Sequence, residues 1–258
     1  MKNSKVQLIY ILTVITALLI LTGNGQCFPS EKEISQLQQQ TKTLPIGERI
    51  ALWAENFVGT PYDTDPLGAY VRNKVIVYDK SVDCMYHVFR SVELAFGGTP
   101  EESLKIALNL RFKTKGKLGS DGLVTNYDDR FQYAEDMVSS GKWGTDITQE
   151  IGSTTKIKGD RGVESVSIVP KENIKDVLSK LKSGDIVFLI KKVEKRVVGE
   201  IVGHEGVIKV ENGDVYLIHA SGLKNKENEN YKVKKVPLLD YAVNMSFIGI
   251  TVSRFTTH

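Results

Sequence analysis

The chain has 258 residues, of which 34 are Lys or Arg and 31 are Asp or Glu, and its formal net charge is +3. This near-balance argues against a nucleic-acid-binding protein, because such proteins concentrate basic side chains on one surface. No repeat and no linker composition divides the sequence, so we expect a single domain over residues 46–258.

The first 25 residues have the pattern of a secretory signal peptide. Lys2 and Lys5 precede an almost wholly apolar stretch, residues 6–22, and small residues stand at positions −3 and −1 of a cleavage site after Gly25. Removing this segment takes away two lysines and no acidic residue, which leaves a net charge of about +1. We therefore expect an exported protein of the periplasm or cell envelope.

Cys27 leaves two further possibilities open at the start of the exported chain. A lipoprotein signal places a cysteine near this position, although Gln26 is larger than the small residue that usually precedes it. Membrane attachment is expected only if Cys27 is lipidated, because no second segment approaches the ~18 apolar residues of a membrane-spanning helix. An oxidising compartment would also permit a disulfide between Cys27 and Cys84.

Beyond the signal segment, hydrophobic spacing predicts helices first and strands last. Residues 26–45 form a polar, Gln-rich leader with helical tendency, which we expect to be frayed. The order of elements is typical of an α+β fold, with a helical and loop insertion at about residues 99–180. Helices are expected over residues 46–58, 84–96, 99–110, 129–140 and 174–181, and strands within residues 145–170, 185–190, 203–220 and 247–252.

Cys84 lies where a helix is predicted to begin. Asp83 is a favoured N-cap residue, and the apolar positions that follow recur at helical spacing as far as Phe96. A thiol in the first turn experiences the positive end of the helix dipole, so we expect its pKa to be lowered. The pattern thus indicates a nucleophile, and the alternative is a small buried side chain on a core helix.

Two histidines fall on the strands of a predicted hairpin. Asn212-Gly213 stands between two apolar runs and predicts a two-residue turn that pairs Ile208 with Leu217. In that register His204 and His219 share the apolar face as diagonal neighbours, about 7–8 Å apart and within reach of a ring-to-ring hydrogen bond. Each could instead be a satisfied core histidine, but two on one face together with Cys84 favour catalysis.

Other assignments for these residues are less consistent with the sequence. His87 lies three residues after Cys84 on the same helix, where parallel side chains leave no room for a substrate carbonyl, so we expect it to pack or flank the site. No zinc-protease motif exists, because the position four residues after His204 is Ile208. We expect no metal and no cofactor.

The order of these motifs resembles that of NlpC-type papain-like cysteine peptidases and amidases, and within them an N-acetylmuramoyl-L-alanine amidase-like subgroup. The resemblance covers about residues 52–255. Its motifs are Gly59-Thr60-Pro61-Tyr62, Asp83-Cys84, Ser183-Gly184-Asp185-Ile186-Val187, Gly203-His204-Glu205-Gly206-Val207-Ile208 and Ile218-His219-Ala220-Ser221. The subgroup is supported by Pro66-Leu67-Gly68, Leu110-Arg111-Phe112, Asp129-Arg130, Trp143-Gly144-Thr145-Asp146-Ile147-Thr148 and Gly249-Ile250-Thr251-Val252-Ser253-Arg254.

This resemblance implies a papain-like core, with the nucleophile at a helix start packed on an antiparallel sheet, and a role for each matching residue. Cys84 would be the nucleophile, His204 the base and His219 the residue that orients the base. Tyr62 and Asp83 would adjoin the oxyanion and substrate. Candidate substrate contacts are Arg111, Tyr127, Arg130, Trp143 and Ser221.

The implied substrates are peptidoglycan fragments, or muropeptides. In the subgroup, the amide between the lactyl group of N-acetylmuramic acid and L-alanine is cut, in fragments that carry an anhydro sugar. One alternative is an endopeptidase that cuts between D-glutamate and a diamino acid in the stem peptide. An alternative of another class is a cell-wall-binding module without activity.

Overall fold

The strands of the protein form an antiparallel sheet, seen in a computed structural model that describes residues 28–222 and 231–256. The sheet order is β2-β3-β8-β4-β5-β6-β7, and β1 pairs with β8. The strands are β1 (Thr145–Asp146), β2 (Thr155–Lys158), β3 (Ser165–Pro170), β4 (Ile186–Ile190), β5 (Val202–Glu211), β6 (Asp214–Ser221), β7 (Lys232–Pro237) and β8 (Gly249–Arg254).

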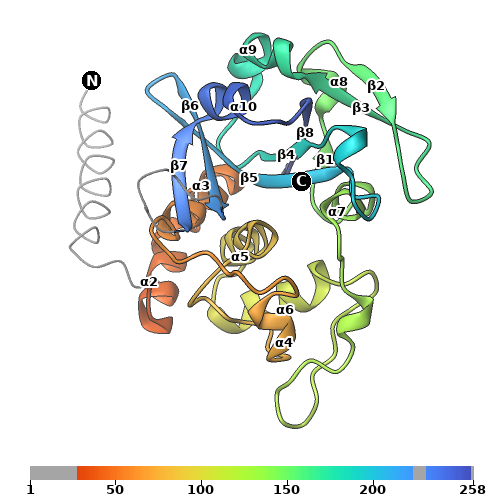
Figure 1. Cartoon of the computed structure of the whole chain (residues 1–258). Coiled ribbons are helices and arrows are strands. Elements are labelled where there is room, and N and C mark those ends of the chain that lie inside the picture. The colour runs from red at the N-terminus through yellow and green to blue at the C-terminus, as the bar shows by residue number, and fades with distance from the viewer. Residues whose placement is uncertain (1–27, 223–230, 257–258) are drawn as a thin grey trace, which may run out of the picture.

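Helices cover both faces of this sheet (Figure 1). The N-terminal helices lie below it in that view, and α9 and α10 lie above. The helices are α2 (Glu31–Thr41), α3 (Ile46–Asn56), α4 (Ala69–Arg72), α5 (Cys84–Phe96), α6 (Pro100–Leu110), α7 (Ala134–Ser139), α8 (Thr148–Ile151), α9 (Ile174–Val177) and α10 (Leu238–Asn244). Short 3-10 turns are η1 (Tyr127–Asp129), η2 (Lys171–Asn173), η3 (Leu178–Lys180) and η4 (Val193–Lys195). The predicted α+β fold is thus confirmed.

Two apolar layers hold the central strands between these helices. Phe188 and Val207 belong to the core that contains α3 and α5. Leu189 and Ile208 belong to a second core under α9 and α10. Because successive strand residues point to opposite faces, β4 can be buried at every position only when both faces are covered.

The predicted hairpin of β5 and β6 is present, and five residue pairs have the expected register, from Val207 with Ile218 to Glu211 with Asp214. Asn212 and Gly213 both have positive φ, 53° and 92°, as a type I′ turn requires. The face opposite the histidines is also buried around Val207 and Ile218. Glu205 on that face is itself fully buried, and its other polar residues, Lys209, Glu211, Asp214 and Tyr216, lie nearer the turn.

The leader is ordered where the structure describes it, which corrects the expectation of a frayed segment. Ser30 and Glu33 form a reciprocal capping box at the start of α2. Ile34 and Leu37 enter the main core, and buried Gln38 donates hydrogen bonds to Leu94 O at 3.1 Å and Ser103 Oγ at 2.8 Å. Two apolar residues among many glutamines were too weak a signal for a packed helix. Residues 1–25 and Cys27 lie outside the described residues.

A buried charge network fastens α6 to α5. Arg111 is 1% exposed and donates to both carboxyl oxygens of Glu93, from Nε to Oε1 and from Nη2 to Oε2 at 2.7 Å. Arg90 joins Glu93 at 3.2 Å and Asp79 at 2.8 Å. The Arg111 guanidinium also lies 4.7 Å from the ring centre of Tyr86. Arg111, expected to contact substrate, is therefore a core residue with no surface to offer a ligand.

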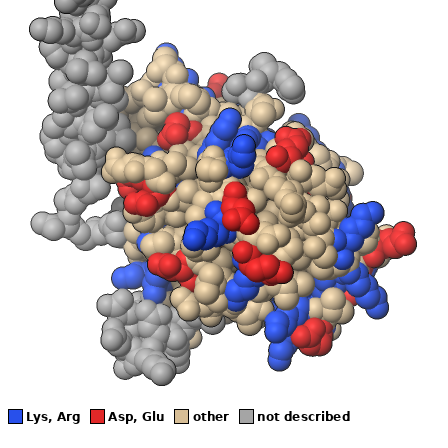
Figure 2. Space-filling view, turned by 90° about the horizontal axis from the view of Figure 1, so that it is seen from above, with Lys and Arg blue, Asp and Glu red and all other residues tan. Residues whose placement is uncertain are grey.

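The outer surface mixes charges of both signs. On the face seen in Figure 2, Lys and Arg side chains alternate with Asp and Glu, without a continuous basic area. Within residues 28–222 and 231–256, no helix is both long enough and apolar enough to cross a membrane.

Replacing Arg111 by Met should strongly destabilise the protein, because Glu93 would keep a buried charge with only Arg90 as its partner. We expect a loss of about 3 kcal/mol in the free energy of unfolding, measured by urea titration. Arg72→Met is the matched control, since that arginine is exposed and pairs with Asp65 at the surface, where ion pairs contribute little. Equal losses of unfolding free energy in the two variants would show that the buried network contributes no more to stability than a surface ion pair.

Candidate active site

Cys84 is the first residue of α5, and Asp83 caps the helix by accepting a hydrogen bond from the Tyr86 backbone N–H at 2.6 Å. The thiol is free and half-buried. The backbone amides of Met85 and Glu205 lie close enough to the sulfur to lower its pKa. The contact with Glu205 places the start of α5 against β5, one residue from His204.

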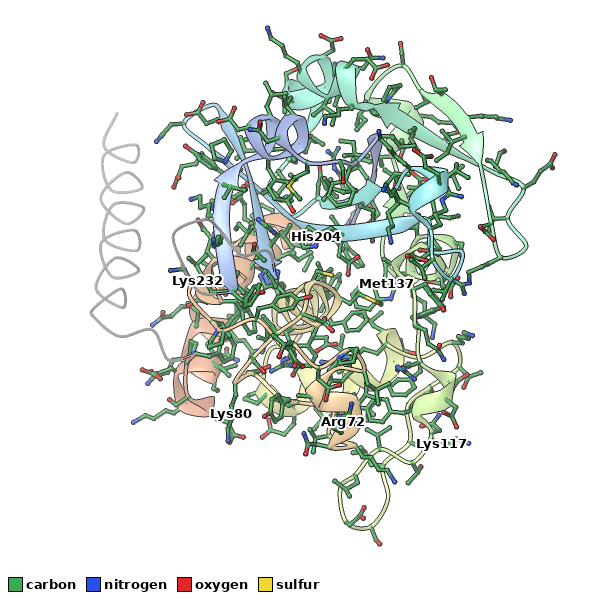
Figure 3. All side chains as sticks on the ribbon, in the orientation of Figure 1. Arg72, Lys80, Lys117, Met137, His204 and Lys232 are labelled. Atoms are coloured by element: carbon green, nitrogen blue, oxygen red, sulfur yellow. The ribbon has the colours of Figure 1, made fainter. Side chains whose placement is uncertain are left out.

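His204 and His219 form a hydrogen-bonded pair. His204 Nε2 lies 2.7 Å from His219 Nδ1, and the two rings are nearly perpendicular, at 87°. Figure 3 shows His204 on the part of β5 that lies over α5. The ring-to-ring hydrogen bond expected from the hairpin register is therefore confirmed.

Two glycines make this arrangement possible. The pairing of β5 with β4 slips at Gly203, because Leu189 pairs with His204 while Ile190 pairs with Val202. Such a bulge re-aims the side chain beside it. At Gly206, an added Cβ would lie 2.6 Å from Ile218 O and 3.0 Å from His219 Cβ, so only glycine leaves room for the second imidazole.

Tyr241 completes the surroundings of the histidine pair and was not found from the sequence. It extends from α10, and its ring centre lies 4.5 Å from that of His219 and 6.0 Å from that of His204. Burial raises the pKa of its hydroxyl, and the charge of Cys84 contributes, so Tyr241 also adjoins the thiol. The only sequence signal was a short apolar run before Tyr241, which is too short to predict a helix.

Burial sets the protonation state of the three central groups. It raises the pKa of the Cys84 thiol well above its usual value, with further contributions from Asp83 and Glu205. Burial lowers the pKa of His204 to about 4, and burial together with His204 lowers that of His219 to about 2. The expectation that the helix dipole would lower the thiol pKa is therefore wrong. At neutral pH the resting site holds a thiol and two neutral imidazoles.

Tyr62 and Asp83 lie together beside the thiol. Tyr62 forms a parallel bridge with Val82, which brings it next to the residues that begin α5. Burial, followed by the charges of Cys84 and Asp83, raises the pKa of its hydroxyl, so Tyr62 remains a hydrogen-bond donor. Burial also raises the pKa of Asp83 to about 6.

The remaining candidate residues divide between the core and the half-buried shell. Trp143 is fully buried and donates from Nε1 to Leu110 O at 3.1 Å, so it has no exposed surface for stacking on a substrate. Tyr127 and Arg130 are half-buried and bonded to each other, Nη1 to the Tyr127 carbonyl at 3.1 Å. Ser221 is 8% exposed, two residues after His219 on β6.

His87 packs inside the protein and takes no part in the histidine pair. It is fully buried, its Nε2 lies 3.3 Å from Ala54 O, and its ring meets that of Phe57 edge to face. Among the side chains that the structure describes, no group of three or more His, Cys, Asp and Glu could hold a metal ion.

The same fold is found in several solved structures. An N-acetylmuramoyl-L-alanine amidase from Bacteroides uniformis aligns with a TM-score of 0.62 and 18% identity, over 82% of this chain and 99% of that chain. A Legionella pneumophila protein of the family model DUF1460 aligns with a TM-score of 0.65 and 16% identity, over 86% and 93%. A putative xylanase from Bacteroides fragilis gives 0.60 and 21%, over 78% and 99%.

No protein-family model matches the sequence, and no curated protein matches it. The solved structures therefore establish a shared fold, and a shared fold does not by itself establish a function. The reaction that this chain supports depends on the arrangement of Cys84, His204 and His219.

An NMR titration should show His204 neutral throughout the physiological pH range. Its ring resonances, assigned by comparison with His204→Gln, should titrate near pH 4 instead of the usual 6.5. Because the folded pKa is the lower one, the imidazole's contribution to stability is lost as pH falls from 6.5 toward 4. A midpoint near 6.5 would contradict the burial described above.

Proposed function

We propose that the protein is a cysteine hydrolase that cuts the amide between N-acetylmuramic acid and L-alanine in muropeptides. The observation that carries this proposal is the 2.7 Å hydrogen bond between His204 and His219, with His204 next to Glu205, whose backbone amide acts on the Cys84 thiol at the start of α5. The Bacteroides uniformis amidase, matched over 99% of its length, has the same fold and supports the choice of substrate. We further propose that the protein is exported, as its first 25 residues predict.

The hydrogen bond between the imidazoles assigns their roles. We assign His219 as the hydrogen-bond acceptor at Nδ1, which is one of the two tautomers open to its neutral ring. His204 then donates from Nε2, and its Nδ1 is left free to accept the proton of Cys84. His219 stabilises the imidazolium that results and keeps the ring in one tautomer and orientation.

Catalysis begins from the neutral pair. As Cys84 Sγ attacks the amide carbonyl, its proton passes to His204, so charge develops only when substrate is present. We assign the oxyanion donors as Tyr62, which stays protonated, and the backbone N–H groups at the start of α5. The carbon–nitrogen bond then breaks, and His204 returns the proton to the leaving amine.

Water completes the cycle by hydrolysing the thioester on Cys84. His204 removes a proton from the water, hydroxide adds to the carbonyl, and the thiolate leaves and is reprotonated. The products are the lactyl carboxylate of the sugar and a peptide that begins with L-alanine.

Digestion of a defined muropeptide tests this reaction by product mass. Wild type should release the free sugar and an intact peptide beginning with L-alanine, and Cys84→Ala should release neither. Ser179→Ala, an exposed substitution on η3, is the control and should behave as wild type. A product that has lost its two N-terminal amino acids would identify the endopeptidase instead. Binding without cleavage by wild type would identify an inactive wall-binding module.

Tyr241 should matter for turnover through the position of the imidazoles. Tyr241→Ala removes the ring that lies against His219, and we expect kcat to fall about tenfold or more with a smaller change in KM. Tyr241→Phe keeps the ring and should retain most of the activity. A result in which both variants lose the same activity would assign the role to the hydroxyl and not to ring packing.

A further inference from the structure

Glu205 is a fully buried carboxyl group beside the candidate nucleophile, and the reaction proposed above does not use it. It lies between His204 and Gly206 on β5 and is 0% exposed. It pairs with Phe188 on β4, whose side chain lies in the core that contains α5, so Glu205 faces the same layer. Neither of its carboxyl oxygens has a hydrogen-bond partner among residues 28–222 and 231–256.

The charged side chains that act on Glu205 are acids. They are Asp83, which caps α5, and Glu135 of α7. Glu135 already accepts hydrogen bonds from the backbone of Ile201 at 3.1 Å and is paired with Arg161 at 3.1 Å. Together with burial, these two acids raise the pKa of the Glu205 carboxyl well above its usual range.

The buried carboxyl therefore differs from the charge network around Arg111. There, each carboxylate has an arginine within hydrogen-bond distance, as Glu93 has in Arg111 at 2.7 Å. An ionised carboxylate without such a partner is strongly unfavourable inside a protein, and the neutral acid is the form that burial favours. Glu205 is also close enough to Cys84 for its backbone amide and its side-chain charge to act on the sulfur.

We propose that Glu205 is a positioning residue that acts through Cys84 by controlling when the thiol can lose its proton. Glu205 is held as a neutral acid, and Glu205 and Cys84 together carry at most one negative charge. The proposal rests on Cys84 being the nucleophile. While Glu205 keeps its proton, Cys84 can ionise when His204 accepts its proton. Once Glu205 loses its proton, the carboxylate opposes a thiolate beside it, as Asp83 also does.

The dependence of thiol alkylation on pH tests this coupling without any substrate. Iodoacetamide modification of Cys84, followed by intact mass, is compared in wild type and Glu205→Gln, which keeps shape and removes the charge. At the lowest pH the two rates should coincide, because Glu205 is neutral in wild type. At higher pH the wild-type rate should rise more gradually, and the variant should become about tenfold faster, with its midpoint lower by about one unit.

Glu211→Gln is the matched control, because it lies on the same strand, is exposed and should leave the alkylation profile unchanged. Glu205→Met is a second neutral variant and should reproduce the shift seen with Gln. Profiles of wild type and Glu205→Gln that coincide at every pH would overturn the coupling. A Glu205→Gln variant slower than wild type throughout would overturn it too, because the carboxyl would then assist ionisation. These outcomes are independent of which bond the enzyme cuts.

Stability provides a second readout. Because the folded pKa of Glu205 lies above the unfolded one, wild type loses stability as pH rises through that folded pKa. The melting temperature of Glu205→Gln should therefore exceed that of wild type by a margin that grows with pH, while Glu211→Gln shows no such trend. A difference independent of pH would contradict a neutral buried acid.

Discussion

The contact between the first turn of α5 and strand β5 is the interaction on which the candidate site depends. Asp83 fixes where α5 begins, and the amide of Glu205 meets the sulfur of Cys84 there. The same end of β5 carries His204, which the bulge at Gly203 turns toward its partner. A helix start and a strand end thus place Cys84 against Glu205, the neighbour of His204, although the two lie far apart in sequence.

Burial then decides how these groups are charged. Where the fold supplies arginines, as around Glu93, charges are paired inside the protein. The charged side chains that act on Cys84 are the acids Asp83 and Glu205, and burial favours the neutral forms of the thiol, the imidazoles and the Glu205 carboxyl. In the proposed reaction such a site separates charge only when the substrate carbonyl receives the electrons of the thiolate.

The sequence predicted those features of the site that depend on residues adjacent in the chain, namely a helix cap and a turn. The Asp83 cap defined one helix start, and Asn212-Gly213 defined the register that pairs the histidines. Tyr241 and the burial of Glu205 depend on which helices cover the sheet, and no short motif encodes that packing. Arg111 was misassigned for the same reason, because its partner Glu93 lies 18 residues away on another helix.

His219 is proposed to act only through His204, and a double-mutant cycle of the two histidines tests this dependence. Muropeptide turnover is measured for His204→Ala, His219→Ala and the double variant, each checked for folding. If the imidazoles act as one unit, the double variant should be no slower than His204→Ala alone. If the two losses multiply instead, His219 acts independently of His204, and the assignment of a base with its orienting partner is wrong.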